Sequence, residues 1–173
     1  VIINAMEWGR KAVANGDDLE ARAQVQWASI VALNGWVSVG TNYTPPMHMI
    51  EHALSAHHDI THGAGLAIVG PAWMRFAAKH RPHRFAQFAQ RVFGLPPEGK
   101  DDTDLAMDGI DAYARFLSEI GCPSRLSEVG IGDALLTQYA KDAALVLHDA
   151  QGRLLGRPPM SQEDIVEVLR AAL

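Results

Sequence analysis

Apolar residues recur every three or four positions along most of this chain, a spacing that is typical of helices packed on one side. We expect helices over residues 1–15, 17–39, 47–57, 65–79, 84–93, 104–120, 133–147 and 161–173. No alternating apolar and polar run exceeds four residues, so no strand is predicted. The predicted fold class is all-α, with seven to nine helices and one domain over residues 1–173.

Helix boundaries follow from capping residues and breakers. Gly16 suits the end of the first helix, and Asp17 with Glu20 forms a capping-box pattern at the start of the second. Pro71 is expected to kink or interrupt the fourth helix, and Ser161 to cap the last. The face of the second helix that we expect to pack consists of Leu19, Ala23, Trp27, Ile30, Val31 and Val37.

Composition narrows the class of protein. A net charge of −5 gives no attraction to nucleic acid or to anionic lipid surfaces. The apolar run around residues 66–74 is too short to span a membrane, no signal peptide is visible, and Cys122 is a lone cysteine. These features favour a cytoplasmic protein. The chain starts at Val1 inside a helical pattern without an N-cap, so we expect further sequence upstream.

Five of the eight histidines fall within residues 48–62, which makes this segment the candidate for chemistry. His48 and His52 are four residues apart, a spacing that puts two imidazoles on one face of a helix. His62 precedes Gly63, where a turn could bring its ring back towards that helix. The cluster indicates a metal site, a proton relay or both. His57 and His58 could equally line a loop.

A longer motif around these histidines identifies a resemblance. The stretches His48-Met-Ile-Glu-His52-Ala-Leu-Ser-Ala and Asp59-Ile-Thr-His62-Gly63-Ala-Gly65-Leu-Ala-Ile-Val-Gly-Pro71-Ala-Trp73-Met resemble the iron-dependent (group III) alcohol dehydrogenases. Residues 32–35 and 121–131 are similar to the same family. Within it, the resemblance is to the branch of NAD(P)H-dependent butanol dehydrogenases and aldehyde reductases, and it covers essentially the whole chain.

This resemblance implies the C-terminal helical domain of a two-domain enzyme. The family's N-terminal α/β nucleotide-binding domain is not represented here. One divalent metal, Fe²⁺ or sometimes Zn²⁺, is held in the family by an Asp, a His one turn later and two more histidines. The last two correspond to His48 and His62. His52 corresponds to a histidine beside the metal that is catalytic and lies near the nicotinamide.

The resemblance further implies NAD or NADP as cofactor, a small alcohol or aldehyde as substrate, and a homodimer. The Asp-x-x-x-His pair is expected upstream of Val1. We therefore expect the isolated chain to be inactive.

Two other classes remain open from the residues alone. The adjacent pair His58-Asp59 is a feature of helical HD-type metal-dependent phosphohydrolases, although these need a further histidine upstream and none precedes His48. The chain could also be a folded helical module that catalyses nothing by itself.

Overall fold

The computed structural model describes all residues from 1 to 173 and contains eight α-helices, two short 3-10 helices and no β-strand. The extended backbone pairing is limited to two isolated antiparallel β-bridges, which join Leu154 to His148 and to Met160. The prediction of an all-α chain with seven to nine helices is therefore confirmed. The chain forms two compact units, residues 1–43 and residues 44–173, which are described separately.

The first unit contains two α-helices, α1 (Ile2–Ala14) and α2 (Leu19–Leu33), followed by the short 3-10 helix η1 (Trp36–Ser38). The predicted N-cap was one residue off. Asp18 caps α2 by accepting a hydrogen bond from the Ala21 N–H at 2.9 Å. Asp17 instead donates its N–H to the side chain of Asn15, which continues the turn after α1. The capping box with Glu20 is therefore not formed.

The predicted packing face of α2 was also wrong. The buried residues of this helix are Ala21 and Ala28, whereas Trp27 and Ile30 are exposed. α2 ends at Leu33, so Val37 lies in η1 and not on the helix. Both buried residues of α2 are therefore alanines, and its large apolar side chains lie at the surface.

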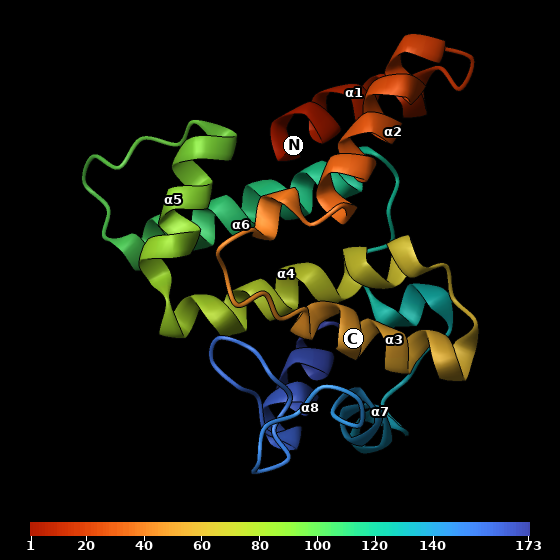
Figure 1. Cartoon of the computed structure of the whole chain (residues 1–173), viewed down its shortest axis with the longest axis vertical. Helices are drawn as coiled ribbons and strands as arrows, with labels where there is room; N and C mark the ends of the chain where they lie inside the picture. Colours follow the sequence, from red (N-terminus) through yellow and green to blue (C-terminus); the bar gives the residue numbers. More distant parts are fainter. The chain divides into compact units, whose positions relative to one another are not determined.

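The second unit contains the other helices, drawn from orange to blue in Figure 1. They are α3 (Pro46–His58), α4 (His62–His80), α5 (Pro82–Phe93), α6 (Asp102–Glu119), η2 (Leu126–Val129), α7 (Leu136–Ala143) and α8 (Gln162–Ala171). Its main core joins α3, α4, α7 and α8. The largest fully buried side chains in that core are Ile50, Leu54, Ile68, Leu126, Ile131, Tyr139, Leu154, Met160, Ile165 and Leu169.

Three boundaries in this unit bear on the sequence predictions. α4 continues through Pro71 without interruption, contrary to the expected break, and it begins three residues earlier than predicted. α7 is shorter than the predicted helix 133–147 because the chain enters turns on both sides of it. The start of α8 was predicted correctly: Ser161 and Asp164 form a reciprocal capping box.

The close approach of α5 and α6 depends on glycine. A Cβ built on Gly109 would lie 2.5 Å from the Cβ of Ala89, which is closer than two carbon atoms approach. No helix in the structure combines the length and apolar character that crossing a bilayer requires.

Candidate metal centre

The turn between α3 and α4 determines where His62 lies. α3 ends at His58, and the next residue, Asp59, adopts a left-handed conformation with φ of +50°. Aspartate is one of the few residues besides glycine that tolerates this conformation, and it ends a helix sharply. Three residues after Asp59, α4 begins with His62, so the first turn of α4 stands against α3.

Three imidazoles converge across this turn. The ring centroids of His48 and His52 are 6.2 Å apart, and each lies 5.3 Å from the ring of His62. One ligating atom from each residue falls within 4.8 Å of the other two. His48 is partly buried, while His52 and His62 are exposed, so the cluster opens to the surface of the unit.

The spacing of these nitrogens fits a divalent metal. His48 Nδ1 and His62 Nε2 are 3.3 Å apart. Two nitrogens bound at 2.0–2.1 Å to one tetrahedral ion are separated by about 3.3–3.4 Å. The pair is thus already at the separation that a shared ion would impose, and imidazole suits iron and zinc alike.

A buried carboxylate stands behind the cluster. Glu51, one residue before His52, has no exposed surface, and its Oε2 accepts a hydrogen bond from Nδ1 of His62. A carboxylate oxygen can only accept, so this bond places the proton of His62 on Nδ1. The Nε2 lone pair of His62 is then directed towards His48, which is the form of imidazole that binds a metal.

The electrostatics of His48 favour the same chemistry. Burial lowers the pKa of its imidazole from the usual 6.5, and the neighbouring His62 and His52 lower that pKa further. The carboxylate of Glu51 acts in the opposite direction on this pKa. Because the net shift is downward, His48 is neutral at physiological pH and its ring is free to act as a ligand.

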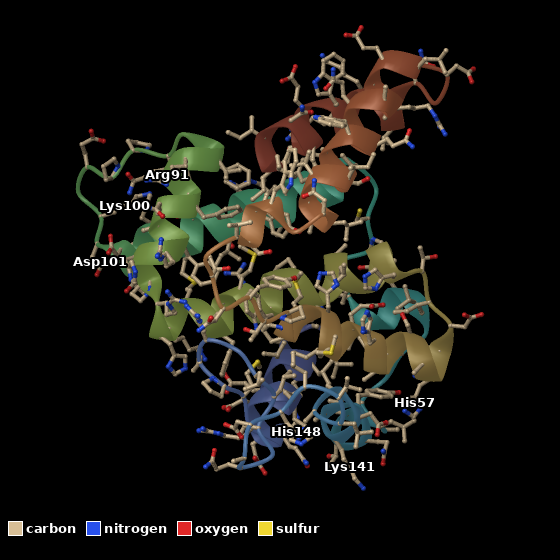
Figure 2. The ribbon with its side chains drawn as sticks, in the orientation of Figure 1. His57, Arg91, Lys100, Asp101, Lys141 and His148 are labelled. Carbon is tan, nitrogen blue, oxygen red and sulfur yellow. The ribbon has the colours of Figure 1, made fainter.

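The other two histidines of the motif have different surroundings. His57 and His58 are the last residues of α3 and not part of a loop. Nε2 of His57 lies 2.8 Å from Oδ2 of Asp142, and Nε2 of His58 lies 2.5 Å from the hydroxyl of Tyr139. Figure 2 shows His57 at the end of α3 that faces α7, the helix that carries Lys141.

The structure therefore brings together all three residues that the sequence singled out: His48, His52 and His62. It does not choose between the pairing of His48 with His52, which the spacing alone favours, and the pairing of His48 with His62, which the resemblance implies. Sequence reasoning assigned no role to Glu51 and missed its contact with His62. The available signal was a single acid on the buried face of a helix, four residues before a serine.

The fold and the cluster define the class as an all-helical domain with a candidate metal site on its surface. Residues 2–173 match the family model described as "Fe-containing alcohol dehydrogenase family, C-terminal". This chain belongs to that family.

Several relatives are similar along nearly the whole chain. NADH-dependent butanol dehydrogenase A of Clostridium acetobutylicum is 35% identical over 171 residues, which is 98% of this chain and 43% of that protein. The NADPH-dependent aldehyde reductase YqhD of Escherichia coli is 33% identical over 141 residues, 82% of this chain and 36% of that protein. The chain thus spans less than half the length of the curated relatives it matches.

Solved structures agree with this assignment. The crystal structure of NADH-dependent butanol dehydrogenase A from Thermotoga maritima superposes with a TM-score of 0.87 at 35% identity, covering 96% of this chain and 42% of that one. The cofactor-free form of YqhD from E. coli superposes with a TM-score of 0.87 at 26% identity, over 99% of this chain and 44% of that one. The family resemblance inferred from the histidine motif is confirmed.

Proposed function

We propose that this chain provides the metal-binding part of an NAD(P)H-dependent dehydrogenase that interconverts aldehydes and primary alcohols. The observation that carries the proposal is the convergence of His48 and His62 within the family's motif. The names of the relatives, butanol dehydrogenases and an aldehyde reductase, support a small aldehyde or alcohol as substrate. Nothing in the cluster favours the HD-type phosphohydrolase, since the His58 ring is bound to Tyr139.

His48 and His62 would hold Fe²⁺, or Zn²⁺, together with an aspartate and a histidine from elsewhere in the complete protein. When bound, the metal supplies Lewis-acid stabilisation of the negative charge that develops on the substrate oxygen. The residues of this chain present two imidazoles with nitrogens 3.3 Å apart, and Glu51 hydrogen-bonds the His62 ring on the side away from His48.

His52 would handle the proton. Its ring lies 5.3 Å from that of His62 and is exposed, so it faces the space in which a substrate would approach the cluster. An imidazole in this position can donate a proton to the nascent alkoxide when hydride arrives, and can accept it in the reverse direction. It would also lie beside the nicotinamide, whose nucleotide would be bound by the N-terminal domain of the complete enzyme.

The assembly proposed for the complete protein is a homodimer that acts in the cytoplasm. It would also contain an α/β nucleotide-binding domain. This chain covers 43% of the butanol dehydrogenase from C. acetobutylicum, and the remaining length of that relative is sufficient for such a domain. The isolated 173-residue chain would fold without turning over substrate, because it holds two of the four metal ligands.

Metal removal from the full-length protein tests this proposal. We expect anaerobically purified protein to reduce butanal with NADH or NADPH and to lose this activity when a strong chelator removes the metal. Added Fe²⁺ or Zn²⁺ should restore it, while Mg²⁺, which prefers oxygen ligands, should not. Activity that survives complete metal removal would refute the proposal, as would phosphatase activity with Mn²⁺ in place of aldehyde reduction.

A further inference from the structure

Glu51 is the only charged side chain in the chain that is fully buried. An ionised carboxylate taken out of water is costly unless hydrogen bonds or an opposite charge compensate it. No lysine or arginine forms an ion pair with Glu51. Its compensation therefore has to come from other hydrogen-bond donors, and the structure shows where they are.

Two side chains donate to this carboxylate. The hydroxyl of Ser55, one turn further along α3, hydrogen-bonds Oε1, and Nδ1 of His62 hydrogen-bonds Oε2. The same hydroxyl lies 3.2 Å from the carbonyl oxygen of Ile60, so Ser55 sits between the carboxylate and the turn that leads to His62. Both oxygens of Glu51 are thereby directed at the α3–α4 junction.

The first turn of α4 completes the surroundings of the carboxylate. A Cβ built on Gly65 would lie 2.6 Å from Oε1 and 2.7 Å from Cγ of Glu51. The carboxylate is thus pressed against the N-terminal turn of α4, where the helix dipole favours a negative charge. Only a residue without a side chain leaves this space open.

We propose that Glu51 is a positioning residue for the metal: it fixes the tautomer and the orientation of His62 so that Nε2 is presented to the ion. This inference rests on the proposed function, in which His62 is a ligand. The side chain of His62 is 48% exposed, so packing alone does not hold its ring. A carboxylate that accepts a hydrogen bond from a ligating imidazole also makes the other nitrogen of that ring more basic, so that it binds the metal more strongly. Losing such a partner weakens metal binding 10- to 100-fold.

Two glycines in the same helical turn offer a matched test. The Cβ that Gly65→Ala adds would clash with the Glu51 carboxylate, whereas a Cβ at Gly63 meets nothing within 4 Å. Both changes add the same methyl group to the first turn of α4 and touch no proposed ligand. A difference between the two variants therefore reports on the position of Glu51 and not on the helix itself.

Zinc affinity of the full-length protein, measured by competition with a chromophoric chelator, is the first readout. Glu51→Gln keeps the size of the side chain and removes its charge, and we expect it to weaken zinc binding 10- to 100-fold. Gly65→Ala should weaken it to a similar degree, while Gly63→Ala should stay within about threefold of the unsubstituted protein.

The protonation pattern of the His62 ring, read from ¹⁵N NMR of the metal-free 173-residue chain, is the second readout. We expect the proton on Nδ1 in the unsubstituted chain and in Gly63→Ala, and a mixture of tautomers in Gly65→Ala. A purely structural role of Glu51 would change stability without moving this signal.

The two readouts separate failure of the inference from failure of the proposed function. If Glu51→Gln and Gly65→Ala bind zinc as tightly as the unsubstituted protein, Glu51 does not position the ligand. A proton found on Nε2 of His62 in the unsubstituted chain would overturn the inference as well. If the unsubstituted protein itself fails to bind zinc or iron, the proposed function falls and this role of Glu51 falls with it.

Discussion

The two ends of helix α3 carry histidines in very different settings. Near its start, His48 and His52 face His62 across the α3–α4 turn, and the rings lie 5.3–6.2 Å apart. At its end, His57 and His58 contact α7: Nε2 of His57 hydrogen-bonds the carboxylate of Asp142, and Nε2 of His58 hydrogen-bonds the hydroxyl of Tyr139. One helix thus presents imidazoles to each other at one end and to a neighbouring helix at the other.

The difference shows how to separate a candidate site from a structural cluster. An imidazole nitrogen that already hydrogen-bonds a carboxylate or a phenol of the fold is not available to a metal. At the first end, the hydrogen bond of His62 to the fold involves Nδ1 and leaves Nε2 facing His48. The number of histidines is therefore less informative than whether the ring nitrogens that the fold leaves unbonded converge, as they do for His48, His52 and His62.

The largest effect is expected from removing a ligand at the first end. In the full-length protein, His48→Ala or His62→Ala should abolish stoichiometric metal and lower aldehyde reduction by about 10³-fold or more, because the metal contributes several kcal/mol of transition-state stabilisation. Metal content by atomic absorption and the rate of NAD(P)H oxidation measure the two losses together.

His57→Ala is the matched control for this prediction, since it removes an imidazole from the other end of the same helix. It should retain metal and rate within about twofold, as expected for a residue whose exposed ring contacts only α7. If all of these variants keep full activity, or if His57→Ala loses its metal, the distinction between the two ends is wrong.

A second, smaller effect separates the roles within the first end. His52→Ala should keep the metal but slow turnover by about 10²-fold, because a positioned general acid typically contributes at least that much. The relevant comparison is between metal content and kcat in one preparation. Loss of metal in His52→Ala would instead make His52 a ligand, which the close approach of the three rings would then explain.

Much of this arrangement was predictable from the sequence, and the reasons are local. The capping box at Ser161 and the apolar spacing in α4 and α6 act within a few residues, so the pattern reveals them directly. The family motif around His48 and His62 then identified the candidate ligands, which no spacing rule would have paired across 14 residues.

The failures have one cause, which is that packing depends on distant partners. Leu19 and Trp27 were placed on the apolar face of the second helix, yet both are exposed and the buried residues of α2 are Ala21 and Ala28. Pro71 was expected to kink or interrupt α4, and the structure shows one helix from His62 to His80 with Pro71 inside it. The role of Glu51 was equally hidden, since it depends on Gly65 from the next helix.

At the second end of α3, a moderate effect on stability is expected without any effect on the metal. Tyr139 is buried with its hydroxyl bound to His58, and Tyr139→Phe removes only that hydrogen bond. Because the His58 ring is exposed and can bind water instead, the loss should be about 1 kcal/mol in the free energy of unfolding. Urea denaturation measures it. A change in zinc affinity would show that the two ends are coupled.

The smallest effect concerns pH and the pair formed by His57 and Asp142. The hydrogen bond from His57 lowers the pKa of the Asp142 carboxyl below its usual 3.8, and a second hydrogen bond from Gln138 adds to this shift. A carboxyl whose folded-state pKa is lowered stabilises the fold above its unfolded pKa, and this stabilisation is lost as pH falls through the folded value. The contribution is therefore complete at pH 6 and is lost progressively as the pH falls below the usual Asp value of 3.8.

His57→Ala should accordingly lower the free energy of unfolding at pH 6 by about 0.5 kcal/mol, the size typical of a partly exposed pair. At pH 3 the difference between this variant and the unsubstituted chain should be smaller, because this pH lies below the usual Asp pKa of 3.8 and the unfolded chains then bind the proton. Urea titrations at the two pH values test this directly. An equal difference at pH 3 and pH 6 would mean that His57 stabilises the α3–α7 contact by packing and not through the carboxylate.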